Sequence, residues 1–160
     1  MLSYYIWEVN ALKACKKSRE DRLSGIARTF ELEIIYAFGS NAGDALKWLK
    51  DEQMLLSISS PSDLDIAIKP ATKKKLSVKE KVHLAIALED LFCVSRVDLV
   101  NLPEADPFLA ANIIRGERLF SKNTYLSDEY DLYILRRAGD LIPLERERIA
   151  LIMGEKNEPE

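Results

Sequence analysis

The chain opens with a helical hydrophobic pattern followed by a short apolar run. Residues 19–31 carry apolar side chains at the spacing of one helix face, and Ser18 stands three residues before Asp21 as a capping signal. Residues 34–38 (IIYAF) form an apolar run that stops at Gly39-Ser40, which is typical of a buried strand ending in a tight turn. The pattern therefore predicts a helix, a strand and a turn.

The rest of the chain continues this mixture of elements. We expect helices over 41–52 and 78–92, a helix that starts at Pro107 and runs through FLAANIIRGERL, and strands over 64–68, 94–102 and 118–121. Residues 53–62 are interpreted as a loop. A last helical region opens at Ser127 and is broken or kinked near Gly139 and Pro143. The length fits one domain over 1–153 with a C-terminal helical region, followed by a frayed tail over 154–160.

Acidic residues interrupt two of the predicted strands. Side chains alternate along a strand, so Asp63 and Asp65 project from one face while Leu64 projects from the other. Asp98 stands likewise between two apolar residues of a later strand. Each acid alone is explained as well by a strand end or a wet sheet face. Taken together, three carboxylates in apolar strands are costly to keep charged unless a cation compensates them. The set of three acids therefore favours binding of a hard cation such as Mg²⁺.

The turn at Gly39-Ser40 adds a second kind of chemistry. A strand that ends in Gly-Ser before a helix offers backbone N–H groups and a helix N-terminus to a phosphate. By itself the pair is better explained as a simple strand-to-helix turn. The informative feature is the order along the chain, in which this turn precedes the paired acids and then the third acid.

Composition and charge narrow the class of protein. The chain is 48% hydrophobic and 31% charged, as in ordinary globular proteins, and its net charge of −3 gives no direct evidence for nucleic-acid binding. Cys15 and Cys93 have no metal-ligand spacing, and the apolar surroundings of Cys93 predict a buried thiol. The N-terminus lacks a secretory leader, and no apolar run is long enough for a membrane span. We therefore expect a cytoplasmic protein.

The ordered motifs resemble a known family. YAFGSNAGDAL, SDLDIAI, RVDLVNL and the later NIIRGERLF are similar to the signature of the nucleotidyltransferase superfamily that includes polymerase beta. Within it they resemble the minimal nucleotidyltransferase (MNT) branch of MntA-type antitoxins, over about residues 18–121. The resemblance implies an α/β (α+β) fold with a mixed, twisted sheet of about four strands and helices mainly on one face.

The resemblance also implies a site. Gly39 and Ser40 would contact the triphosphate of ATP, and Asp63 and Asp65 would bind two Mg²⁺ ions. Asp98 would complete the shell of the catalytic ion and help to activate the acceptor hydroxyl. The segment Asn41–Ser62, 22 residues long, exceeds the usual spacing in the branch. It is explained either by a longer helix and loop beside the site or by a remodelled nucleotide pocket.

Three functions remain open from the sequence. The first is an adenylyltransferase that adds AMP to a hydroxyl, a tyrosine of a HEPN-type partner toxin, and so acts as an antitoxin. The second is a catalytically weak or inactive binding module of the same fold that neutralises or scaffolds a partner protein. The third, an antibiotic adenylyltransferase, is less favoured because no second domain to hold a drug is evident.

Overall fold

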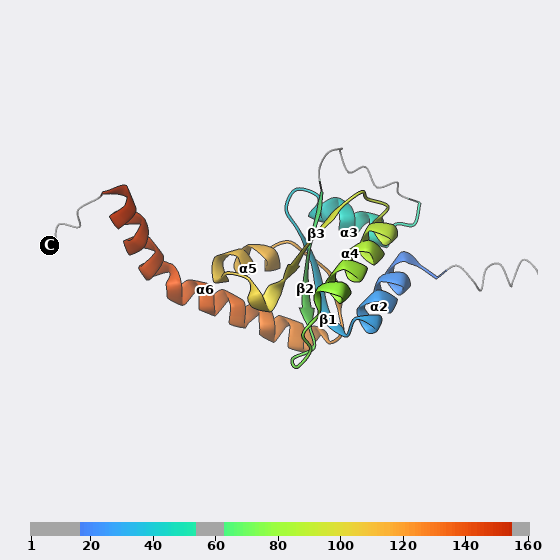
Figure 1. Cartoon of the computed structure of the whole chain (residues 1–160). Coiled ribbons are helices and arrows are strands. Elements are labelled where there is room, and N and C mark those ends of the chain that lie inside the picture. Colours follow the sequence, from blue (N-terminus) through green and yellow to red (C-terminus); the bar gives the residue numbers. More distant parts are fainter. Residues whose placement is uncertain (1–16, 54–62, 155–160) are drawn as a thin grey trace, which may run out of the picture.

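A four-stranded sheet with helices on both faces forms the body of the protein (Figure 1). The computed structural model describes residues 17–53 and 63–154. The strands are β1 (Leu32–Phe38), β2 (Leu64–Pro70), β3 (Val97–Asn101) and β4 (Glu117–Ser121). The helices are α2 (Arg19–Thr29), α3 (Ala42–Lys50), α4 (Val78–Phe92), α5 (Pro107–Ile114), α6 (Thr124–Met153) and the short 3₁₀-helix η1 (Leu102–Glu104).

The sheet is mixed, as the sequence predicts. Its strand order is β3-β2-β1-β4, with β1 antiparallel to both β2 and β4. β2 and β3 are parallel, and α4 makes the crossover between them. This crossover brings the starts of β2 and β3 to the same end of the sheet, where β1 finishes.

Two apolar cores lie on opposite faces of the sheet. The inward side chains of β2, Leu64, Ile66 and Ile68, are fully buried in the core that the sheet shares with α2, α3 and α4. On the other face Ala67 belongs to a second core formed with α5 and α6. Three helices therefore cover one face, and the second face is covered more fully than predicted.

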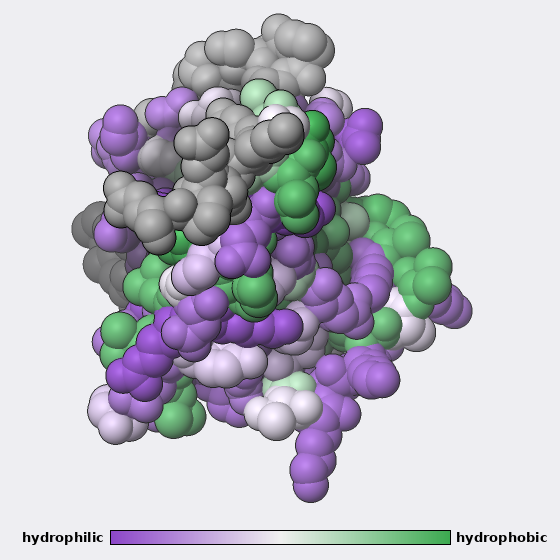
Figure 2. Space-filling view, turned by 90° about the vertical axis from the view of Figure 1, so that its left-hand side faces the viewer, coloured by the Kyte–Doolittle hydropathy of each residue, from purple (hydrophilic) through white to green (hydrophobic). Residues whose placement is uncertain are grey.

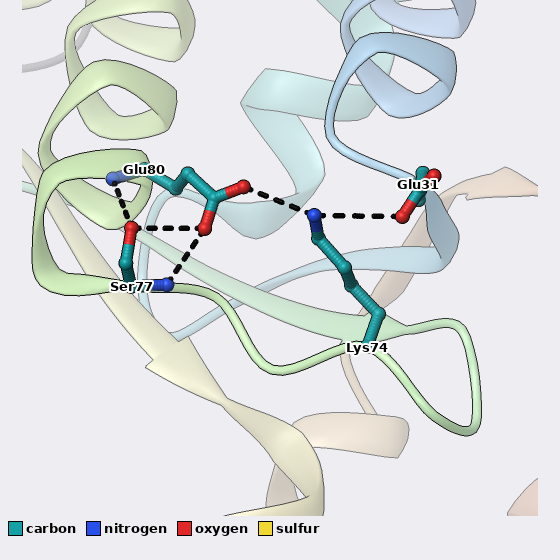
Figure 3. Close-up of polar contacts among 4 residues, drawn as sticks. All are labelled: Glu31, Lys74, Ser77 and Glu80. Carbon is teal, nitrogen blue, oxygen red and sulfur yellow. Dashed lines mark hydrogen bonds and ion pairs between the residues drawn. The ribbon is translucent and has the colours of Figure 1, made fainter.

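The loop between β2 and α4 is fixed by a polar cluster (Figure 3). The Ser77 side chain accepts a hydrogen bond from the backbone N–H of Glu80, and the Glu80 carboxylate accepts one from the Ser77 N–H at 2.8 Å, which confirms the capping interaction. Lys74 lies 3.0 Å from Glu80 and 3.5 Å from Glu31. The Ser77 backbone N–H and the Lys74 ammonium lower the pKa of Glu80 to about 2. The cluster thus links the end of α2 to the start of α4.

The N-terminal half of α6 is tied to the sheet by a second polar cluster. Tyr36, almost completely buried in β1, donates its hydroxyl hydrogen to Asp131 of α6. Arg118 of β4 lies 2.6 Å from Asp131 and 2.8 Å from Asp128. Burial, with the bond to Asp131, raises the pKa of Tyr36. These contacts hold α6 across two strands.

The course of α6 differs from the prediction. The helix starts at Thr124 because Asn123 is its cap, accepting a hydrogen bond from the backbone N–H of Leu126. Ser127, the predicted start, is instead buried within the helix, 2.7 Å from Ser121. The helix also continues through Pro143, although its axis changes direction in the C-terminal half (Figure 1).

Two further local predictions are wrong. Cys93 is exposed, because it follows the last turn of α4 and adopts a left-handed conformation with φ of 54°. α5 ends at Ile114, well before the predicted end, since Gly116 turns the chain into β4. Residues 54–62 of the predicted loop and residues 155–160 of the predicted tail lie outside the described residues. The extent of the domain therefore stays a prediction.

Over 17–53 and 63–154, no helix has the length and apolar character needed to cross a membrane.

Candidate active site

The three predicted acids lie at one end of the sheet. Asp63 directly precedes β2, and Asp65 is the second residue of that strand. Asp98 is the second residue of β3 and pairs in register with Asp65. Neighbouring strands are about 4.8 Å apart, so these two carboxylates emerge side by side. The fully buried Leu64 and Ile66 project from the opposite face, which confirms the predicted alternation.

The predicted Gly-Ser turn borders these acids. β1 ends at Phe38, which pairs with Asp65, and Gly39 follows with φ of +75°. A Cβ at Gly39 would lie only 2.7 Å from Asp65 Oδ2. Ser40 is exposed in the same turn, immediately before α3. The positive φ therefore favours glycine at this position, and a Cβ there would also displace the Asp65 carboxylate.

Asn41 fixes the geometry of the turn. Its side chain is buried, and Nδ2 donates a hydrogen bond to the backbone carbonyl of Asp63 at 3.1 Å. The bond joins the start of α3 to the start of β2, although the segment between them is long. No local sequence signal marks this role, because Asn before a helix is ordinarily explained as a cap. Here the Asn41 side chain makes no capping hydrogen bond.

Arg96 is a second residue that the sequence analysis did not single out. Its guanidinium lies 2.9 Å from Asp98 and 3.7 Å from Asp63, so it bridges two of the three acids. Its side chain is 65% exposed, against 33% for Asp63 and 43% for Asp98. The only sequence signal is its position two residues before Asp98, on the same side of the strand. Arg96 is a displaceable counter-ion rather than a buried partner.

Asp65 is the least compensated of the acids. Burial raises the pKa of its carboxyl, and the nearby charges of Asp98 and Asp63 raise it further. Within 17–53 and 63–154, no three acidic, histidine or cysteine side chains stand close enough to form a ready-made metal cage. Mg²⁺ does not need one, because it keeps waters and takes one or two carboxylates plus substrate phosphates. The carboxylate oxygens and the poorly compensated charge of Asp65 fit such an ion.

A second glycine lets the chain pack behind the turn. A Cβ at Gly116 would lie 2.4 Å from the carbonyl oxygen of Ala37 and 3.1 Å from Cα of Phe38. The start of β4 therefore packs directly against the end of β1. This contact supports the strand end from which Gly39 and Ser40 emerge.

Comparisons with known proteins agree with this fold. The family model for polymerase beta nucleotidyltransferases matches residues 22–125. No curated protein sequence matches the chain significantly.

Several solved structures share the fold. A mutant of the toxin-antitoxin MntA-HpeT is 20% identical over 84% of this chain and 98% of that chain, with a TM-score of 0.63. A toxin-antitoxin with AMP-PNP is 21% identical over 84% and 98% of the two chains, with a TM-score of 0.62. A complex of the tri-AMPylated HEPN toxin of Shewanella oneidensis with its MNT antitoxin is 21% identical over 84% and 96%, with a TM-score of 0.59. At this identity the likeness is one of fold.

Proposed function

The chain belongs to the polymerase beta nucleotidyltransferase family, and we propose that it transfers AMP from ATP to a hydroxyl group with the help of Mg²⁺. The observation that carries the proposal is the in-register pairing of Asp65 with Asp98 beside Gly39. Carboxylates that can bind cations then lie next to a turn that can bind phosphates. The proposed reaction needs both kinds of group. We assign the reaction to the cytoplasm, where ATP is available.

In this proposal each site residue has a role. Asp63 and Asp65 would hold two Mg²⁺ ions, and Asp98 would complete the shell of one. Such ions would supply neutralisation of the charge on the triphosphate. The backbone N–H groups of the exposed residues Gly39 and Ser40, with the N-terminus of α3, would bind the phosphates.

The transfer needs no side-chain nucleophile. The acceptor hydroxyl oxygen forms a bond to the α-phosphorus, and its proton passes towards Asp98. The bond from the α-phosphorus to the bridging oxygen breaks, and pyrophosphate leaves. The protein contributes position and charge, which account for most of the catalysis in phosphoryl-transfer enzymes of this kind.

A tyrosine on a HEPN-type partner toxin is the acceptor that we infer. The fold neighbours are toxin-antitoxin complexes, one of which contains an AMPylated HEPN toxin. The C-terminal half of α6 offers a surface for such a partner, with these exposed apolar residues: Ile142, Leu144, Ile149, Leu151, Ile152 and Met153. Figure 2, which faces the side where α6 ends, shows exposed apolar residues among hydrophilic ones. Apolar surface rimmed by charge is typical of an interface.

The proposal is tested by the mass of the partner. A HEPN-type protein encoded beside this chain is incubated with the chain and Mg-ATP, and its mass should rise by one or more AMP groups at tyrosine. Asp63→Asn should abolish the increase while the chain stays folded. Asp140→Asn removes the same charge from an exposed position on α6 and should leave the transfer unchanged.

The alternative is a binding module with little or no catalysis. The ion pairs from Arg96 to Asp98 and Asp63 favour it, because they satisfy two acids without any metal. Thermal melts separate the two functions. A catalytic site should stabilise the chain with Mg-ATP by about 2.7 kcal/mol at a hundredfold excess over Kd. A tight complex with the partner, without stabilisation by any Mg-NTP and without a mass change, would support the module.

A further inference from the structure

A cavity lies on the same sheet face as the acids but at the other end of the strands. Its volume is about 550 Å³, and it lies between the ends of β2 and β3, the start of α5, and α6. Lys69 of β2 and Asn101 of β3 line it. Lys69 lies four positions after Asp65 in β2, about 13 Å along the strand. The cavity is thus distinct from the carboxylates.

The cavity is positively charged although the chain is acidic. Its charged lining residues are Lys69, Lys74, Lys75 and Arg137 against the single acid Glu104, in a chain of net charge −3. Lys69 pairs with Glu33 and Lys74 with Glu31 and Glu80, while Glu104 is paired with Lys81. Among the described residues, Lys75 and Arg137 have no ion-pair partner. Two basic side chains are therefore free to bind an anion.

The lining also has groups suited to a planar ligand. Tyr130 and Tyr133 stand with ring centroids 6.1 Å apart on the α6 side. Aromatic rings of this kind offer flat faces against which a planar ligand can pack.

We propose that this cavity is a second ligand site, which binds a nucleoside monophosphate. The phosphate pairs with Lys75 and Arg137, and the base packs against Tyr130 and Tyr133. A ligand that combines an anion with a flat ring uses both features at once. The volume is within the range of small-molecule sites.

Binding of AMP tests the proposal. AMP is titrated by calorimetry into the full chain in EDTA, where the carboxylate end has no cation to attract a phosphate. We expect saturable binding that persists in Asp65→Asn. Arg137→Gln should weaken it about tenfold, since charge-assisted hydrogen bonds to phosphate are lost. Arg136→Gln is the matched control, because Arg136 is an exposed neighbour on α6 that does not line the cavity.

Other outcomes would overturn the proposal. Absence of saturation at millimolar AMP, an equal loss in Arg136→Gln, or loss of binding in Asp65→Asn would each do so. Adenosine and inorganic phosphate serve as half-ligands, and each should bind at least about tenfold more weakly than AMP. Phosphate that binds as tightly as AMP would reduce the cavity to an oxyanion site and contradict the nucleotide assignment. Melting curves of every variant verify that the fold is intact.

Discussion

Arg96 compensates two of the three acids at the end of the sheet. Its guanidinium bridges Asp98 and Asp63 from an exposed position, so a bound metal ion would compete with Arg96 for the same oxygens. Exposed ion pairs are weak, and the arginine can therefore be displaced.

Replacing this arginine should tighten metal binding. We expect Arg96→Gln to bind Mn²⁺ about two- to fivefold more tightly, because an exposed ion pair contributes at most about 1 kcal/mol. Titration followed by electron paramagnetic resonance measures the affinity directly. Arg146→Gln, which removes an exposed arginine from the far half of α6, should leave it unchanged. Weaker Mn²⁺ binding in Arg96→Gln would show that Arg96 supports the cation instead of competing with it.

Gly39 should tolerate no side chain. Gly39→Ala places a Cβ 2.7 Å from Asp65 Oδ2 at a positive φ, and we expect it to lower the free energy of unfolding by about 1–2 kcal/mol or more and to abolish transfer. Gly43→Ala is the matched control within α3, since its Cβ would meet nothing within 4 Å. The control should stabilise the chain by about 0.5–1 kcal/mol. Urea unfolding of both variants provides the measurement, and equal effects would contradict the assignment.

At the residue scale, the sequence predicted the acids and the turn but not their neighbours. Alternation along a strand fixes the face of Asp65 whatever the tertiary structure is. Arg96 and Asn41 differ, because their partners depend on the pairing of β2 with β3 and on the path from α3 to β2. No local pattern encodes those contacts.

At the scale of elements, the capping cluster of α4 has a defined dependence on pH. The pKa of Glu80 is lowered from 4.5 to about 2, so its contribution to stability is fully present above pH 4.5 and is lost as the pH falls towards 2. Glu80→Gln should therefore flatten the stability curve between these pH values. Chemical denaturation at a series of pH values tests this. Glu129→Gln, a change on the exposed face of α6, should keep the wild-type slope.

The starts of helices were predicted well where the sequence contains a capping residue. Ser77 with Glu80 marks the start of α4, and Asp106 marks that of α5, where its side chain accepts from the backbone N–H of Phe108. The start of α6 was misplaced because Asn123 and Ser127 are both good caps. The contact of Ser127 with Ser121 of β4, a tertiary interaction, decides between them.

The whole molecule has a sheet-bound part and a projecting part. The buried residues of α6 are Ser127, Ile134 and Ala138, and none lies beyond Leu141 (Figure 1). Truncation after Leu141 should therefore change the free energy of unfolding by less than about 1 kcal/mol. It should greatly weaken the complex with a partner protein, measured by gel filtration and calorimetry. A truncated chain that unfolds, or that binds as before, would contradict this division.

The fold class followed from the resemblance to a known family, whereas the second cavity did not. The resemblance implied the mixed sheet, and alternation along the strand put Asp63 and Asp65 on one face. The basic cavity gathers residues from β2, β3, α5 and α6 that are far apart in the chain. In the sequence, the segment that carries the lysines around it is typical of an ordinary solvated loop. The positive charge of the cavity therefore depends on tertiary packing.

The parallel pairing of β2 with β3 also sets when the site can form on the ribosome. Asp65 and Asp98 meet only after all of α4 has been made, and β4, which covers the other side of β1, is made later still. Strands that are far apart in the sequence pair slowly. During synthesis such strands pair last, because the later strand has to be made first. A prematurely ended chain that lacks β3 would carry the first two acids and the turn but no third acid. The cluster of three acids is therefore completed in a single late step of biosynthesis, not gradually as the chain grows.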